Sequence, residues 1–134
     1  MNNSKLIYTI CFFLKLHTCI EGRYITVFRN HGKLSAIDSV CHHAGGPLTV
    51  GPLRDIEDLG LTTVSCPWHN FLVCIDKGVK VFQSIELING GPKPAGWKVG
   101  KVVQRVHLVR EDTEGVFVVS ALLLLLFCMY SFNY

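Results

Sequence analysis

Two mixed pairs of cysteine and histidine constrain this chain more than any other feature of its sequence. Cys41 and His43 have one residue between them, and Cys66 and His69 have two. A Gly-Gly-Pro run follows the first pair and a proline lies inside the second, residues that suit tight loops passing close to a metal. Two loops that each carry one thiolate and one imidazole can hold a binuclear iron–sulfur centre.

A structural zinc site is the main alternative, because two cysteines and two histidines can hold Zn²⁺ tetrahedrally. Zinc fingers and ribbons pair cysteine with a nearby cysteine and histidine with a nearby histidine, whereas each pair in this chain is mixed. The order of the ligands therefore favours iron–sulfur, and metal analysis separates the two.

The chain resembles the Rieske [2Fe–2S] family, and most of all its small soluble ferredoxins, in two segments: Cys41-His42-His43-Ala44-Gly45-Gly46-Pro47-Leu48 and Cys66-Pro67-Trp68-His69. The likeness extends over roughly residues 22–119. It implies an all-β fold of antiparallel sheets with a small cluster-binding subdomain. It also implies one [2Fe–2S] cluster per chain, with Cys41 and Cys66 on one iron and His43 and His69 on the other.

Three further positions are interpreted through this resemblance. In the family a third, proline-containing loop covers the cluster, and residues 90–94, Gly-Gly-Pro-Lys-Pro, resemble it. His42 does not fit the Cys-x-His spacing and is expected to tune the centre from beside its ligands. The high-potential branch has an extra cysteine in each loop, forming a disulfide, and a serine after the last histidine. Here neither loop has another cysteine, and Asn70 and Phe71 follow His69.

These departures bear on the redox potential. Hydrogen bonds to the cluster sulfurs raise the potential, so a missing donor predicts the lower part of the Rieske range of about −150 to +300 mV.

Length and composition limit the class of protein. The 134 residues suit one domain without a second catalytic domain. A formal net charge of +3 is too small to indicate nucleic-acid binding. Cys11, Cys19, Cys74 and Cys128 lack disulfide-like spacing, which favours a reducing, intracellular compartment such as the cytoplasm.

Composition divides the chain into three parts: an apolar segment over 1–20, the Rieske domain over 21–119 and an apolar tail over 120–134. The first part has the outline of a signal peptide but a poor cleavage site, and a buried first strand is the alternative. The tail contains five consecutive leucines but falls short of the ~20 residues of a spanning helix. Membrane attachment through the tail and an irregular terminus both stay open.

Alternating apolar residues predict the strands of the domain. Residues 24–28 and 34–38 form an expected hairpin, and residues 116–119 an expected closing strand. Residues 98–110 have strand period as well, with Val106 and Leu108 on the apolar face and His107 on the opposite, solvated face.

The resemblance implies a single-electron carrier rather than a stand-alone oxidoreductase. It also implies a redox partner protein, either a reductase, an oxygenase or both. The chain is expected to serve an oxygenase system as a component only, because the 15 residues after Val119 contain no His, Asp or Glu for a catalytic iron. From Lys77 to Arg110 there are seven basic residues and one acid, either a docking face for an acidic partner or a solvated edge. A non-redox zinc protein is the remaining alternative.

Overall fold

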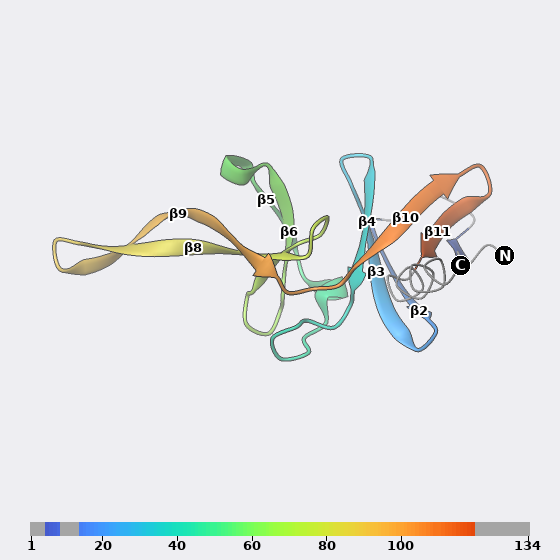
Figure 1. The fold of residues 1–134 in the computed structure, drawn as a ribbon, viewed down its shortest axis with the longest axis horizontal. Coiled ribbons are helices and arrows are strands. Elements are labelled where there is room, and N and C mark those ends of the chain that lie inside the picture. Colours follow the sequence, from blue (N-terminus) through green and yellow to red (C-terminus); the bar gives the residue numbers. More distant parts are fainter. Residues whose placement is uncertain (1–4, 9–13, 120–134) are drawn as a thin grey trace, which may run out of the picture. The chain divides into compact units, whose positions relative to one another are not determined.

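The computed structural model describes residues 5–8 and 14–119, and these form two compact units. Of the described residues, the first unit comprises 5–8, 14–39 and 105–119, and the second comprises Val40–Gln104. Each unit contains one antiparallel sheet (Figure 1). The prediction of an all-β chain built from antiparallel sheets is confirmed.

The sheet of the first unit has six strands in the order β1-β11-β10-β4-β3-β2. These strands are β1 (Lys5–Tyr8), β2 (Lys15–Ile20), β3 (Arg23–Asn30), β4 (Lys33–Asp38), β10 (Val106–Asp112) and β11 (Gly115–Val119). The predicted hairpin is β3 and β4, joined by His31 and Gly32 at φ 50° and 75°. Two successive positive φ angles give the turn whose twist matches paired strands.

Alternation along these strands directs β-branched and aliphatic side chains to one buried cluster. Val27 and Ala36 face each other across β3 and β4. The buried cluster consists of Ile20, Ile25, Val27, Ala36, Val116 and Val118. Burial of apolar surface at about 25 cal/mol per Å² makes this cluster the main source of stability of the first unit.

The prediction that His107 is solvated is wrong. His107 is 3% exposed, whereas its neighbour Leu108, expected on the apolar face, is 59% exposed. The strand period assumed over 98–110 is interrupted, because β9 ends at Val102 and β10 begins at Val106. The inward face also offers a polar partner: His107 Nε2 lies 2.7 Å from Asp38 Oδ1, and Arg23 Nη1 donates to Asp38 Oδ2 at 2.8 Å.

The sheet of the second unit has five strands in the order β5-β6-β7-β8-β9. They are β5 (Leu53–Ile56), β6 (Leu61–Ser65), β7 (Leu72–Cys74), β8 (Val79–Ile88) and β9 (Gly91–Val102), with short 3₁₀ turns η1 (Leu48–Val50) and η2 (Glu57–Leu59). Its buried cluster comprises Ile56, Leu72, Cys74 and Val81.

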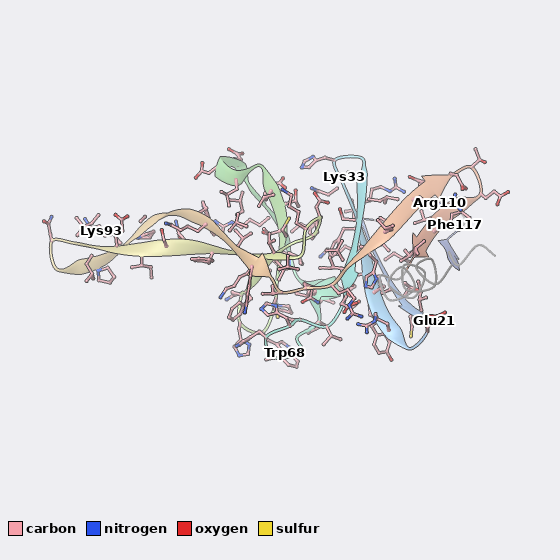
Figure 2. All side chains as sticks on the ribbon, viewed as in Figure 1. Glu21, Lys33, Trp68, Lys93, Arg110 and Phe117 are labelled. Atoms are coloured by element: carbon pink, nitrogen blue, oxygen red, sulfur yellow. The ribbon has the colours of Figure 1, made fainter. Side chains whose placement is uncertain are left out.

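The expected proline-containing cover loop is not a loop. Residues 91–94 belong to β9 and pair with residues 85–88 of β8, and Asn89 and Gly90 make the turn. Within the second unit this hairpin extends away from the Cys–His loops, as the separation of Lys93 at its end from Trp68 shows (Figure 2). Residues 91–94 therefore form a strand through backbone pairing with β8, although their glycine and proline content favours a turn.

The two apolar ends of the chain are only partly visible. Lys5–Tyr8 and Lys15–Ile20, from the N-terminal segment, are strands of the first sheet. The expected tail over 120–134 lies outside the described residues. Among the residues that are described, no helix combines the length and apolar content needed to cross a bilayer.

The burial of His107 predicts acid sensitivity. Burial lowers the pKa of His107 below its unfolded value of about 6.5, although the hydrogen bond to Asp38 opposes the shift. Below pH 6.5 the unfolded chain therefore binds more protons than the folded chain, and stability falls as the pH drops towards the lowered pKa. His107→Phe should weaken this dependence and cost about 1–3 kcal/mol at pH 7.5, because Asp38 loses a partner.

Urea unfolding of wild type and variants at pH 7.5 and 5.5 measures both effects. The matched control is His31→Asn, which removes an exposed turn histidine at φ 50° and should retain the wild-type pH dependence. An undiminished acid loss in His107→Phe would contradict the assignment.

Candidate metal centre

The first Cys–His loop runs from Cys41 to Gly46 and is closed by its own backbone. Gly45 N–H donates to the Cys41 carbonyl at 3.0 Å, and Cys41 N–H donates to the Gly46 carbonyl at 2.9 Å. Gly45 has φ 80°, a left-handed conformation that glycine adopts without steric cost. The cysteine is therefore held by both of its backbone polar groups.

The second loop, from Cys66 to Phe71, repeats this arrangement. Asn70 N–H donates to the Cys66 carbonyl at 2.8 Å, and Cys66 N–H donates to the Phe71 carbonyl at 2.9 Å. Asn70, four residues after the cysteine as Gly45 is in the first loop, has φ 58°. Asparagine tolerates this conformation better than most residues. Asn70 thus allows the backbone to turn at this position. The comparison with the serine of the high-potential branch did not predict this role.

The two loops bring the four sequence-predicted residues into one region, with the thiols inside. Cys41 is 3% exposed and Cys66 is 2% exposed. Burial raises the pKa of the Cys41 thiol, and the adjacent Cys66 thiol adds to the rise. A nearby positive charge, such as a metal ion, would counter this effect of burial on the Cys41 thiol.

The two imidazoles lie on the outside. His43 and His69 are exposed, with ring centroids 4.7 Å apart and ring planes at 89°. Phe71 packs against His43 with a centroid separation of 4.3 Å, which limits the orientations open to that ring. The site therefore has a buried thiol end and an accessible imidazole end.

This donor set fits a binuclear centre. A Cβ added at Gly46 would lie 2.5 Å from Cys66 Sγ and 3.1 Å from the Trp68 ring, so glycine keeps the space beside the sulfur open. Within residues 5–8 and 14–119, no three His, Cys, Asp or Glu side chains are grouped to hold one metal ion. A mixed [2Fe–2S] centre requires only two protein ligands on each iron.

His42 lies beside the thiols, as expected, without sharing the position of His43. Its Nδ1 is 3.9 Å from Cys41 Sγ, and its ring meets Phe71 edge-on with centroids 5.8 Å apart. Burial, followed by the charges of His43 and Lys80, lowers the pKa of His42. A neutral His42 is thus favoured near pH 7.

No cysteine near the loops is engaged in a disulfide. Among the described residues, Cys19, Cys41, Cys66 and Cys74 are free thiols. Cys74 is a buried side chain of the apolar cluster, as its position in a strand suggested.

Gln104 is a residue of this site that the sequence did not reveal. It is 3% exposed. Its Nε2 donates to the Val40 carbonyl at 2.7 Å, and its Oε1 accepts from His42 N–H at 3.1 Å. One side-chain amide thereby bridges the backbone on both sides of Cys41. The contact joins positions more than 60 residues apart in the chain, and no local motif signals it.

Replacement of Gln104 should loosen the first loop. Gln104→Leu keeps the volume but leaves a part-buried carbonyl and a part-buried N–H without this partner, which should cost about 1–3 kcal/mol. The rate at which chelator bleaches the reconstituted protein should rise, and reconstitution should be less complete. Gln104→Glu, which retains an acceptor for His42 N–H, should fall between wild type and Gln104→Leu. Equal bleaching rates for all three proteins would contradict the bridging role.

Comparison with known proteins agrees with this architecture. The family model described as soluble Rieske-type ferredoxin matches residues 11–122. The human protein named Rieske domain-containing protein is 30% identical over 104 residues, which are 78% of this chain and 64% of that protein. The chain thus spans less than two thirds of the length of this relative.

Two solved structures share the fold. The ferredoxin of carbazole 1,9a-dioxygenase from Nocardioides aromaticivorans IC177 superposes with a TM-score of 0.60 at 18% identity, covering 87% of this chain and 97% of its own. A chain from the complex of reduced oxygenase and oxidised ferredoxin in carbazole 1,9a-dioxygenase gives 0.53 at 17% identity, covering 78% and 86%. Since the family match extends over most of the sequence, this chain belongs to the soluble Rieske-type ferredoxins, whose cofactor is a [2Fe–2S] cluster.

Proposed function

We propose that this protein carries single electrons on a [2Fe–2S] cluster bound by Cys41, His43, Cys66 and His69. The observation that carries the proposal is the pair of matching loops. Each loop is closed by both backbone polar groups of its cysteine, and each presents one buried thiol and one exposed imidazole. When bound, the cluster supplies a reversible one-electron couple, which histidine ligation places above that of four-cysteine plant-type clusters.

The two ends of this site have different roles. The buried thiol end excludes water and keeps the local dielectric low, so that the surrounding hydrogen bonds and charges act on the centre strongly. The exposed imidazole end, with His43 and His69, is the shortest route for an electron between the site and a partner. The His43 ring packs against Phe71 and is exposed on its other side, so it needs to move little when an electron passes.

The partner is a protein that gives or takes one electron. Support comes from the structural neighbour solved as a complex of reduced oxygenase and oxidised ferredoxin in carbazole 1,9a-dioxygenase. By analogy, a reductase supplies the electron and an oxygenase or similar enzyme receives it. The free thiols favour a reducing, intracellular setting.

Metal and sulfide content is the first test of the proposal. Anaerobically purified protein should contain about two irons and two acid-labile sulfides per chain, and its dithionite-reduced form should show the low average g value of mixed His/Cys ligation. Alanine at Cys41, His43, Cys66 or His69 should abolish or convert the EPR signal, whereas His42→Ala should preserve it. One tightly bound zinc without sulfide would refute the cluster. Bleaching by His42→Ala but not by His43→Ala would refute the ligand assignment.

The midpoint potential is the second test. The loops lack a disulfide, and Asn70 and Phe71 stand where the high-potential branch has a serine donor. Because donors to sulfur favour the reduced, more negative state, the potential at pH 7 should lie near or below about −50 mV. Protein-film voltammetry measures it. A midpoint well above about +100 mV, in the upper half of the Rieske range, would mean that another donor acts on the sulfurs.

A further inference from the structure

A groove beside the second Cys–His loop is a feature of the second unit that the proposed function does not use. It has a volume of about 690 Å³ and begins at His69. Its wall continues through Phe71 to strand β8 and across to Trp97 of strand β9. The groove therefore starts at the imidazole end of the site, where an electron would leave.

Two cations line this groove, each held over aromatic rings. The Arg54 guanidinium carbon lies 4.8 Å from the Trp97 ring centroid. Lys80 Nζ lies 4.9 Å from the centroid of Phe71 and 5.7 Å from that of Phe82. Cation–π contacts of this kind hold the side chains in place without neutralising their charge.

The groove contains no opposite charge. None of its lining residues is an aspartate or glutamate. Asp55, the acid next to Arg54 in sequence, accepts a hydrogen bond from Thr62 Oγ1 at 2.6 Å. Among the salt bridges between described residues, none involves Arg54 or Lys80. The groove is therefore complementary in charge to a negatively charged ligand.

We infer that the groove binds an acidic segment of the redox partner, with carboxylates at Arg54 and Lys80 and an apolar side chain against Phe82 and Trp97. The inference rests on the proposed function, because a partner docked here would contact His69 directly. Carboxylates form charge-assisted hydrogen bonds with guanidinium and ammonium groups. Complementary charge also orients the encounter and raises its rate. The groove therefore offers cations that bind carboxylates, and it lies beside His69, where an electron would leave.

A peptide with the proposed chemistry tests the groove. The probe is acetyl-Asp-Glu-Phe-Asp-Glu-amide carrying an uncharged fluorophore, and its matched control is acetyl-Asn-Gln-Phe-Asn-Gln-amide. Titration of cluster-loaded protein, followed by fluorescence anisotropy, should show about tenfold or tighter binding of the acidic peptide than of the neutral one. The double variant Arg54→Gln/Lys80→Gln should lose about tenfold in affinity for the acidic peptide, the equivalent of about 1.4 kcal/mol.

A second double variant distinguishes binding in the groove from a general effect of the protein's positive charge. Lys93→Gln/Lys101→Gln removes the same charge from two exposed residues of β9 that do not line the groove, and its affinity should stay within about twofold of wild type. An equal loss in both double variants would overturn the inference, as would equal binding of the two peptides. Concentration-dependent dimerisation that disappears in Arg54→Gln/Lys80→Gln would assign the groove to a second copy of the chain instead.

Voltammetry of the same samples distinguishes a failure of the groove inference from a failure of the electron-carrier proposal. Every variant should retain the reversible one-electron wave of the wild type. Loss of that wave in the wild-type protein would refute the electron-carrier proposal whatever the peptide does. A normal wave together with no preference for the acidic peptide would refute only the groove.

Discussion

The backbone hydrogen bonds that close the two Cys–His loops are the interaction on which the site depends. In each loop the N–H and the carbonyl of the cysteine are both engaged, and the fourth residue after the cysteine, Gly45 or Asn70, has a positive φ. The main chain of a cysteine fixed in this way cannot move without breaking two hydrogen bonds, each worth about 1 kcal/mol net. The sheet of the second unit supplies the rest: β6 leads into Cys66 and β7 follows Phe71. The main chain thus sets where each cysteine side chain begins, which leaves the intervening side chains free for other roles.

Sequence reasoning could identify the four candidate ligands because their spacing, with glycines and prolines around them, is local information. The β3–β4 hairpin and the closing strand β11 were predictable for the same reason. Contacts between distant segments were not. Gln104 reaches the first loop from more than 60 residues away. His107 points inward because its ring forms a hydrogen bond with Asp38 there. Residues 91–94 extend a strand rather than cover the site because β8 offers backbone partners.

These misses share a physical cause. A period-two pattern states that neighbours point to opposite faces, but it does not state which face is buried when both carry mixed residues. Around Val106–Leu108 the pattern predicted that the apolar residues point inward, and the hydrogen bond between the buried His107 and Asp38 reversed this orientation. A buried polar group is stable only with a partner, so the correct face depends on Asp38 and Arg23, which belong to other strands. Such information lies in the fold and not in any window of the sequence.

The long hairpin of β8 and β9 has a practical consequence. Beyond the part of β8 that pairs with β7, it is a two-stranded ribbon whose turn, Asn89–Gly90, is exposed. Exposed turns with few contacts tolerate inserted sequence. Because Figure 2 shows this end of the ribbon well separated from Trp68 in the second loop, a surface tether or a reporter tag placed there would leave the two Cys–His loops untouched. The same turn is where a lineage could add recognition sequence without redesigning its redox centre.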